Sequence, residues 1–229
     1  SFKEAAPFFP KEKVAWIGQP IRSEISQPAS NKDALQFFKF ESSLPVILIL
    51  GGSQGAELIN NTVLDALPRL IEKYQVIHQT GVNNFKTVLG RAEVVLGTNP
   101  NKLRYISKPF LNSLEMKMAS GAATLVVSRA GSTLFEIASW GIPAVLIPIT
   151  KTNMDHQRKN AFNYAREGGC SVIEEANMTG NILMSEIERI VDSEHVRNDM
   201  IKSAKAFAKH DAAMKIARVL IDTALSHEE

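Results

Sequence analysis

The segment 46–56 reads VILILGGSQGA and decides the class of fold. Its apolar run Val46–Leu50 has the length and the β-branched content of a buried strand. Glycines follow at once, and an amphipathic stretch of helix length continues over Ala56–Lys73. A buried strand that turns through glycines into a helix begins a βαβ unit, and such units build parallel sheets. We therefore expect an α/β protein.

The same alternation of strand and helix continues along the chain. The further expected strands are Gln75–Gln79, Glu93–Leu96, Leu103–Ile106, Thr124–Val127, Ala144–Ile147 and Ser171–Ile173. The further expected helices are Asn84–Gly90, Leu114–Ser120, Thr133–Trp140 and Asp155–Glu167, with two closing helices before His227. This order predicts a Rossmann-like, doubly wound parallel sheet. In such a sheet, ligands bind beyond the carboxyl ends of the strands.

Residues 1–44 differ in composition from the rest. They are rich in Pro, Ser, Lys and Glu, with one short apolar piece at Val14–Ile17. We interpret them as a linker that carries one edge strand and one short helix, and we place the domain proper at residues 45–229. The chain opens with Ser1 rather than methionine. We therefore expect it to be part of a longer polypeptide.

Composition excludes several classes of partner. The chain has 229 residues, 45% of them hydrophobic, and a formal net charge of +2, so charge alone indicates neither nucleic acid nor an anionic bilayer as a partner. No apolar run approaches the ~18 residues of a membrane span. The single cysteine, Cys170, cannot form an internal disulfide, which suits a reducing cytoplasm. We expect a small buried residue at a strand start there, not a nucleophile.

The glycine-rich turn Gly51–Ala56 is the first candidate binding site. Glycines let the backbone approach a ligand, and the N–H groups at a helix start favour an anion such as a diphosphate, to which Ser53 could add a hydroxyl. A tight turn without a ligand stays open as an explanation. The sequence disfavours a dinucleotide site, because the glycine spacing is not G-x-G-x-x-G and the second strand ends in His78-Gln79 without an acidic residue.

The second candidate site is the strand-to-helix junction SRAGSTLFE at residues 128–136. Thr133 and Glu136 have the spacing of a capping box, which would satisfy the N–H groups of the helix start. The alternative is functional: the helix start faces a phosphate, and the Glu136 carboxylate accepts hydrogen bonds from the two hydroxyls of a ribose. Both interpretations stay open.

Two further polar segments follow the same logic. The helix start at 155–161 reads DHQRKNA, where solvated caps are one explanation and recognition of sugar hydroxyls by Gln157 is the other. His156 lacks a cysteine or histidine partner at ligand spacing, so we expect no metal site. Arg22, in the segment GQPIR at 18–22, is either a surface charge or a group that reaches the nucleotide.

Together these motifs resemble a known family. GQPIR at 18–22, GGSQGA at 51–56, HQTG at 78–81, PF at 109–110, SRAG at 128–131, and HQ with NA at 156–161 follow the order seen in the MurG family of N-acetylglucosaminyltransferases, glycosyltransferase family 28. The resemblance covers nearly the whole chain. It implies the C-terminal, donor-binding half of a GT-B fold, preceded by the interdomain linker. The activity it implies is inverting transfer of GlcNAc from UDP-GlcNAc to lipid I, which makes lipid II in peptidoglycan synthesis.

The resemblance also implies roles for particular residues. The residues expected to bind the donor are Arg22, Gly52, Ser53, Gln54, Gly55, Leu111, Gly131, Ser132, Thr133, Leu134, Phe135, Glu136 and Gln157. Within this set, Ser53 and its neighbours would meet the diphosphate and Leu111 the uracil. Glu136 would hold the ribose, Gln157 the GlcNAc hydroxyls, and Arg22 would close the pocket. Neither cofactor nor protein-bound metal is implied, and the general base is expected in an N-terminal acceptor domain that this chain lacks.

Two departures and several alternatives qualify this interpretation. The segment between Arg129 and Glu136 is one residue shorter than the family's usual spacing, and Gln19 replaces the usual asparagine before Pro20. The acceptor, a polyprenyl diphosphate, would be presented by an N-terminal domain or a partner chain at the cytoplasmic face of the bacterial membrane. The alternatives are a subunit of a split two-chain transferase, a non-catalytic nucleotide-sugar module and, least favoured, a nicotinamide-dependent oxidoreductase domain.

Overall fold

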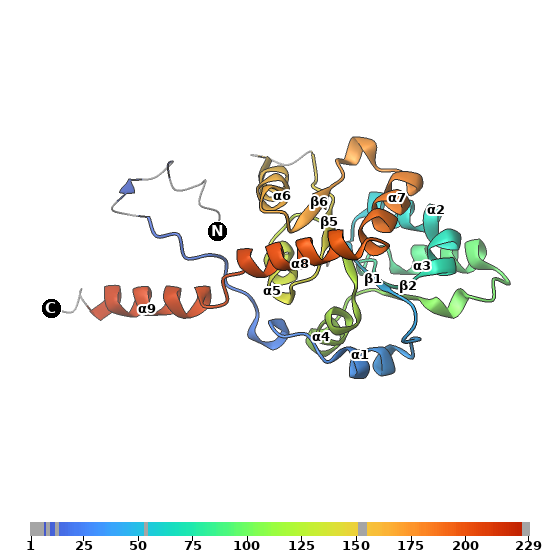
Figure 1. The fold of residues 1–229 in the computed structure, drawn as a ribbon, viewed down its shortest axis with the longest axis horizontal. Coiled ribbons are helices and arrows are strands. Elements are labelled where there is room, and N and C mark those ends of the chain that lie inside the picture. The colour runs from blue at the N-terminus through green and yellow to red at the C-terminus, as the bar shows by residue number, and fades with distance from the viewer. Residues whose placement is uncertain (1–6, 8–9, 12–13, 53–54, 151–154, 226–229) are drawn as a thin grey trace.

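A six-stranded parallel sheet forms the centre of the computed structural model, which describes residues 7, 10–11, 14–52, 55–150 and 155–225 (Figure 1). The strands are β1 (Val46–Leu50), β2 (Gln75–Gln79), β3 (Tyr105–Lys108), β4 (Leu125–Ser128), β5 (Ala144–Leu146) and β6 (Cys170–Val172). Their order across the sheet is β3-β2-β1-β4-β5-β6, and each neighbouring pair is parallel. The expected doubly wound α/β sheet is confirmed.

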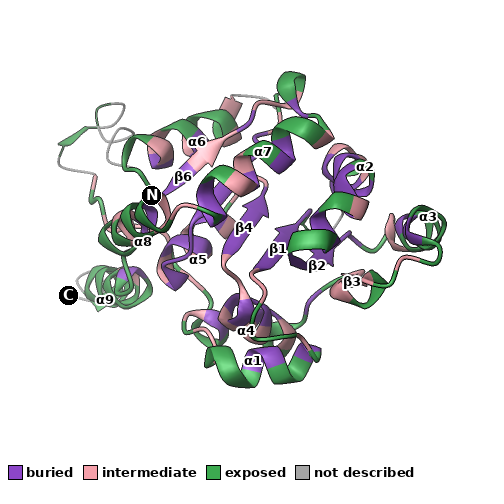
Figure 2. Cartoon of the chain, turned by 45° about the vertical axis from the view of Figure 1, so that its right-hand side comes forward, coloured by how far each residue is buried: buried purple, intermediate pink, exposed green. Residues whose placement is uncertain are grey.

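Helices cover both faces of this sheet (Figure 2). They are α1 (Asn31–Phe38), α2 (Glu57–Lys73), α3 (Phe85–Leu96), α4 (Ser113–Ala122), α5 (Thr133–Trp140), α6 (His156–Arg166), α7 (Gly180–Val191), α8 (Glu194–Phe207) and α9 (Ala212–Leu225), with short 3-10 turns η3 (Ser23–Ile25), η4 (Lys102–Arg104) and η6 (Glu175–Asn177). In β1, Leu48 and Leu50 pack with α4 and α5, whereas Ile47 and Ile49 pack with α2 and α7. The strand is apolar throughout because alternate side chains enter two different cores.

Part of the N-terminal segment belongs to one of these cores. Helix α1 packs on α4, and Ile25, Leu35 and Phe38 lie in the same apolar cluster as the sheet. The indole Nε1 of Trp140 donates a hydrogen bond of 2.7 Å to the carbonyl of Ile25. The helix expected before residue 44 is therefore present, and it is anchored to the domain. The boundary at residue 44 stays a prediction.

Three expectations about secondary structure are wrong. Glu93–Leu96 is the last turn of α3, because Val88, Ala92 and Leu96 recur at helical spacing on its buried side. Val14–Ile17 forms no strand. Trp16 in this segment is 48% exposed, so its side chain is not buried in the way that would hold an edge strand against the sheet. The region after β6 holds three helices, α7 to α9, where we expected two.

The strand register aligns the carboxyl ends of the central strands. Leu50 at the end of β1 lies opposite Gln79 of β2 on one side and Ser128 of β4 on the other. The chain order reverses between β1 and β4, which makes this the switch point where ligands bind in open α/β sheets. None of the described helices has the length and apolar character needed to cross a membrane.

Candidate functional site

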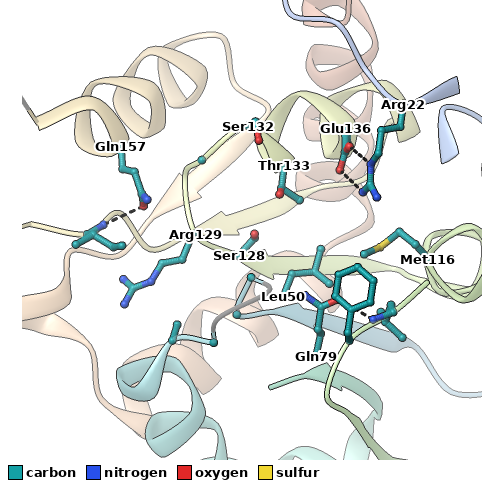
Figure 3. Close-up of a pocket in the computed structure, with 18 residues that line it drawn as sticks. Arg22, Leu50, Gln79, Met116, Ser128, Arg129, Ser132, Thr133, Glu136 and Gln157 are labelled. Atoms are coloured by element: carbon teal, nitrogen blue, oxygen red, sulfur yellow. Dashed lines mark hydrogen bonds and ion pairs between the residues drawn. The ribbon is translucent and has the colours of Figure 1, made fainter. Parts of the chain in front are cut away.

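A cleft of about 460 Å³ opens at the switch point between β1 and β4 (Figure 3). It is lined by residues that directly follow β1, β4 and β5, together with residues from β2 and from the segment after β3. The expected site residues that line it are Arg22, Gly52, Gly55, Leu111, Gly131, Ser132, Thr133, Glu136 and Gln157. Residues from widely separated motifs therefore share one cavity.

The turn after β1 needs glycine at two positions for different reasons. Gly55 has φ +87°, and a side chain there would collide with the carbonyl of Thr80 and the side chain of Asn84. Gly52 has φ +82°, but its added carbon would meet no atom within 4 Å. Gly55 is therefore required by packing, whereas Gly52 keeps the backbone open towards the cleft. Ser53 and Gln54, also expected here, lie outside the described residues.

The start of α5 faces the cleft without a side-chain cap. Ser132 precedes the first helical residue, Thr133, and its side chain makes no capping hydrogen bond. Of the two interpretations left open, the capping box is wrong, since Glu136 lies a residue too far into the helix and its carboxylate bonds Arg22 instead. An added carbon at Gly131 would meet no atom within 4 Å. Helix starts leave backbone N–H groups without intrahelical partners, so this end of α5 suits an anion.

Arg22 and Glu136 form a bidentate ion pair at one end of the cleft (Figure 3). The Nε of Arg22 lies 2.9 Å from Oε1 of Glu136, and its Nη2 lies 3.2 Å from Oε2. The hydrogen bond to Glu136 raises the pKa of the Arg22 guanidinium, although partial burial opposes this shift. Arg22 is therefore no isolated surface charge. It joins the linker to the carboxylate that the sequence indicates for ribose.

An apolar wall adjoins this ion pair. Leu111 is fully buried, and its N–H donates a 3.0 Å hydrogen bond to Oε1 of Gln79 at the end of β2. Phe110, 45% exposed, and the buried Met116 of α4 complete the wall. Apolar side chains at the edge of a cleft suit the face of a nucleobase.

Gln157 lies at the other end of the cleft, away from Glu136 (Figure 3). Its Oε1 accepts a 3.2 Å hydrogen bond from the N–H of Ile149. The oxygen end of the amide is therefore engaged with the chain, and the Nε2 end is the one with hydrogens to donate. The nearby Asn160 bonds the carbonyl of Ala130 instead, which ties α6 to the loop after β4.

Comparison with protein-family models now identifies the family. Residues 46–217 match the glycosyltransferase family 28 C-terminal domain. The chain belongs to this family. The match runs from the first residue of β1 into α9 and so includes the cleft, apart from Arg22 on the preceding segment.

Curated relatives of this family 28 chain carry one activity in their names. A UDP-N-acetylglucosamine–N-acetylmuramyl-(pentapeptide) pyrophosphoryl-undecaprenol N-acetylglucosamine transferase of Acetivibrio thermocellus is 34% identical over 97% of this chain and 59% of its own length. A Bacillus anthracis protein of the same name, numbered 2, is 37% identical over 83% of this chain and 51% of its own length. The chain thus spans between half and three fifths of these relatives.

Solved structures agree on the architecture. The crystal structure of Acinetobacter baumannii MurG matches with a TM-score of 0.70 and 25% identity, over 93% of this chain and 58% of that protein. A UDP-GlcNAc 2-epimerase from Neisseria meningitidis, solved with UDP-GlcNAc, matches with a TM-score of 0.61 at 15% identity, over 83% of this chain and 48% of that protein. The second likeness concerns the fold alone. The expected Rossmann-like half of a GT-B fold is confirmed.

Two expected site residues do not reach the cleft of this family 28 domain. Leu134 is fully buried in the apolar core, and the ring of Phe135 stacks on Phe207 with 6.0 Å between centroids. Their N–H groups bond the carbonyls of Gly131 and Ser132. The helix turn aims consecutive side chains in different directions, so only one side of the motif can face a ligand. Neither residue is among those that line the cleft, and a role of Leu134 and Phe135 in donor binding stays a prediction.

Other cleft residues received no individual role in the sequence interpretation. Ser128, Arg129 and Gln79 line the cleft from strand ends and belong to the motifs SRAG and HQTG, but none of them was among the residues expected to bind the donor. Met116 lies one turn into α4, and no sequence signal sets it apart from a core methionine. In the described part of the chain, no cluster of His, Cys, Asp or Glu could hold a metal ion.

The single cysteine lies apart from the cleft. Cys170 opens β6, is buried, and its Sγ contacts the carbonyl of Ala161 at 3.7 Å. Burial raises the pKa of its thiol, which keeps it protonated near neutral pH. The expectation of a buried structural thiol is confirmed.

Proposed function

We propose that this family 28 domain binds UDP-GlcNAc and is the donor half of an inverting N-acetylglucosaminyltransferase. The observation that carries the proposal is a single cleft in which two glycine-containing helix starts, at α2 and α5, lie between Glu136 and Gln157. A diphosphate suits the helix starts, because their N–H groups and dipoles favour negative charge. A nucleoside and a sugar then extend to the two sides.

Each end of the cleft has chemistry that suits one part of the donor. Glu136 can accept hydrogen bonds from the ribose hydroxyls, and the wall at Leu111 suits the uracil. Gln157, with its amide nitrogen available to donate, suits an oxygen of the GlcNAc. Gly52, Gly131 and the neighbouring Ser132 and Thr133 lie between these groups. Ser53 and Gln54 are proposed to add to the diphosphate contacts.

The proposed role of this domain in catalysis is to stabilise the leaving group. As the acceptor hydroxyl attacks the anomeric carbon, the bond to the diphosphate breaks and negative charge grows on UDP. The helix starts of α2 and α5 are preorganised to favour that charge. We assign no general base to this chain. A second domain or chain would supply the base and hold the acceptor.

The acceptor and the place of action belong to the same proposal, and the pyrophosphoryl-undecaprenol in the names of the relatives supports the choice of acceptor. We expect transfer of GlcNAc to the polyprenyl-linked lipid I, which yields lipid II, at the cytoplasmic face of the bacterial membrane. Fusing this chain to the N-terminal domain of a curated relative tests this part. GlcNAc transfer to lipid I by the fusion supports it, and donor binding without any transfer indicates a non-catalytic module.

Calorimetric titration tests the donor. The chain is titrated in parallel with UDP-GlcNAc, UDP-glucose and NAD. We expect saturable binding with a preference for UDP-GlcNAc. A preference for NAD would overturn the proposal, as would a folded sample that binds no UDP-sugar.

Gly131→Ala tests the phosphate site without disturbing the fold. An added methyl at residue 131 meets no protein atom within 4 Å, so it would stand in the cleft beside the start of α5. We expect affinity for UDP to fall by about tenfold, the equivalent of one or two hydrogen bonds. Gly90→Ala is the matched control, since its methyl also meets no atom within 4 Å but lies on α3. Equal affinities of both variants for UDP would place the phosphate elsewhere.

A further inference from the structure

Three strand ends are tied together at the Gln157 end of the cleft. Arg129 follows β4, Thr150 follows β5, and Glu175 lies in η6 after β6. The Nη1 of Arg129 lies 2.7 Å from Oε1 of Glu175 and donates a 3.1 Å hydrogen bond to the carbonyl of Ile147. The N–H and Oγ1 of Thr150 donate to Oε2 of Glu175 at 3.1 and 2.8 Å. We name Arg129, Thr150 and Glu175 the wall cluster.

The ion pair of the wall cluster is largely enclosed, whereas Thr150 is exposed. The side chains of Arg129 and Glu175 are 14% and 20% exposed. Burial opposes ionisation of Glu175, but the hydrogen bonds from Thr150 and the charge of Arg129 outweigh it and lower the pKa of this carboxyl. The Nε of Arg129 is buried and has no hydrogen-bond partner in the described part of the chain. An ion pair held under such constraint fixes the groups around it.

The backbone held by the wall cluster also holds Gln157. Ile147 and Thr150 bond Arg129 and Glu175, respectively, and Ile149 between them donates its N–H to Oε1 of Gln157. The position of the Ile149 N–H therefore depends on contacts on both sides of it. The direction of the Gln157 amide follows from that N–H, because the bond engages its oxygen and leaves Nε2 for a ligand.

We propose that Arg129 and Glu175 are positioning residues that set the sugar specificity of the cleft by fixing the orientation of the Gln157 amide. This inference rests on the proposed function. In it, the wall cluster does not touch the nucleotide. It holds segment 147–150 so that Gln157 donates a hydrogen bond to an oxygen of the hexose, while the end of the cleft at Arg22 and Glu136 binds UDP independently.

Separate titrations with UDP and UDP-GlcNAc test this division. Glu175→Gln keeps the shape of the side chain and removes its charge. We expect affinity for UDP-GlcNAc to fall by about tenfold, the loss of roughly one well-placed hydrogen bond, and affinity for UDP to stay within about twofold. Glu174→Gln is the matched control: it is the neighbouring carboxylate, it pairs with Arg158 at 2.9 Å instead, and it should change neither affinity.

A double variant tests the route through Gln157. In the wild type, Gln157→Ala should weaken UDP-GlcNAc by about tenfold, but in the Glu175→Gln background the same change should add less than about threefold, because the amide is already misdirected. Independent, multiplying losses would overturn the positioning role. Thr150→Val, which removes only the Oγ1 donor, provides a milder variant if Glu175→Gln fails to fold.

The outcomes separate this inference from the function on which it rests. A wild-type chain that binds neither ligand contradicts the proposed function, and the inference falls with it. A wild-type chain that binds UDP-GlcNAc, with Glu175→Gln weakening both ligands equally or neither, leaves the function standing and overturns the wall cluster as a specificity device.

Discussion

Two arginine–glutamate pairs differ in exposure and in origin, and Figure 3 shows Arg22 with Glu136 at one end of the cleft and Arg129, the arginine of the second pair, at the other. In the pair Arg22–Glu136 the arginine side chain is 47% exposed and comes from the N-terminal segment, whereas the glutamate side chain is 12% exposed. In the pair Arg129–Glu175 the side chains are 14% and 20% exposed and both follow strands of the sheet. An ion pair with one exposed member can exchange that partner at lower cost than a pair in which both side chains are enclosed.

The difference between the two pairs indicates that they have different roles in one binding site. Glu136 has an arginine partner that can give way, so its carboxylate can turn to a ligand hydroxyl. Glu175 has its oxygens committed to Arg129 and Thr150, so it can only hold structure. Two pairs of the same residue types therefore have different roles: one can exchange partners, and the other holds its neighbours in position. The following predictions test this contrast, from the largest expected effect to the smallest.

Removing the enclosed arginine should cost the most stability. Arg129→Met keeps much of the side-chain volume but leaves Glu175 enclosed without its cation. We expect the free energy of unfolding to fall by about 3 kcal/mol, the low end for a broken buried pair because both side chains are partly exposed. Urea denaturation monitored by circular dichroism measures it. A loss no larger than that of Arg22→Met would erase the contrast.

Removing the exchangeable carboxylate should instead cost affinity. For Glu136→Ala we expect UDP-GlcNAc binding to weaken by about 2 kcal/mol, the scale of charged hydrogen bonds, with little change in melting temperature. Calorimetry and thermal unfolding measure the two quantities. Glu115→Ala is the control, because Glu115 closes the capping box of α4 with Asn112, and its loss should lower the melting temperature and leave affinity unchanged. The reverse pattern at Glu136 would indicate a structural carboxylate.

The stability contributed by the Arg129–Glu175 pair should decrease at acidic pH. The pKa of Glu175 is lowered on folding from its usual 4.5, so its stabilisation is present above pH 4.5 and is lost as pH falls through the lower, folded value. The difference in unfolding free energy between wild type and Glu175→Gln should be constant from about pH 5 to 7. Below that range it should shrink by at most about 1.4 kcal/mol per pH unit. A difference that grows on acidification would reverse the sign we assign.

His78 makes a separate contribution to the pH dependence of stability, and this contribution is the same in the wild type and in Glu175→Gln. Burial lowers its pKa from 6.5 to about 3, and its ring nitrogens bond Tyr105 and Asn60. The unfolded chain therefore takes up this proton between about pH 6.5 and 3 while the folded chain does not, and stability falls as pH falls through that window. Subtracting the two pH curves removes this shared contribution.

Removing the exposed arginine should change stability least. For Arg22→Met we expect a smaller loss than for Arg129→Met, because the Arg22 side chain is 47% exposed and solvent screens its charge, although Glu136, 12% exposed, loses its cation. Arg158→Met is the matched control, because Arg158 is 49% exposed and pairs with Glu174. Chemical denaturation of both variants beside wild type suffices. A loss as large as that of Arg129→Met would mean that the N-terminal segment is locked onto the domain.

Local patterns predicted some elements well and others poorly. The helix Thr133–Trp140 and the strands Val46–Leu50 and Gln75–Gln79 match the expected bounds, because apolar spacing and flanking glycines are properties of neighbouring residues. The prediction of a strand at Glu93–Leu96 was wrong because it also depended on neighbouring residues alone. Its four residues carry too little periodicity to exclude a helix, and only the packing of Val88 and Ala92 decides the matter.

The expected capping box shows the same limit at the site itself. Thr133 and Glu136 have the right spacing, but a carboxylate at that spacing has other partners available once the chain is folded. The guanidinium of Arg22, 114 residues earlier, takes it. At Asn112 and Glu115 the same kind of motif does close, since there Asn112 is the N-cap of α4 and Glu115 is the third residue of the helix.

The sequence by itself determined the α/β class, the glycine turns and the strand ends at which a ligand site had to be sought. These depend on side-chain period and backbone freedom, which are local. Only the tertiary structure decided that Arg22 meets Glu136, that Phe135 turns from the cleft to Phe207, and that Arg129, Thr150 and Glu175 close one wall. Such contacts join residues far apart in the chain, and their partners are selected by the order of strands and the packing of helices.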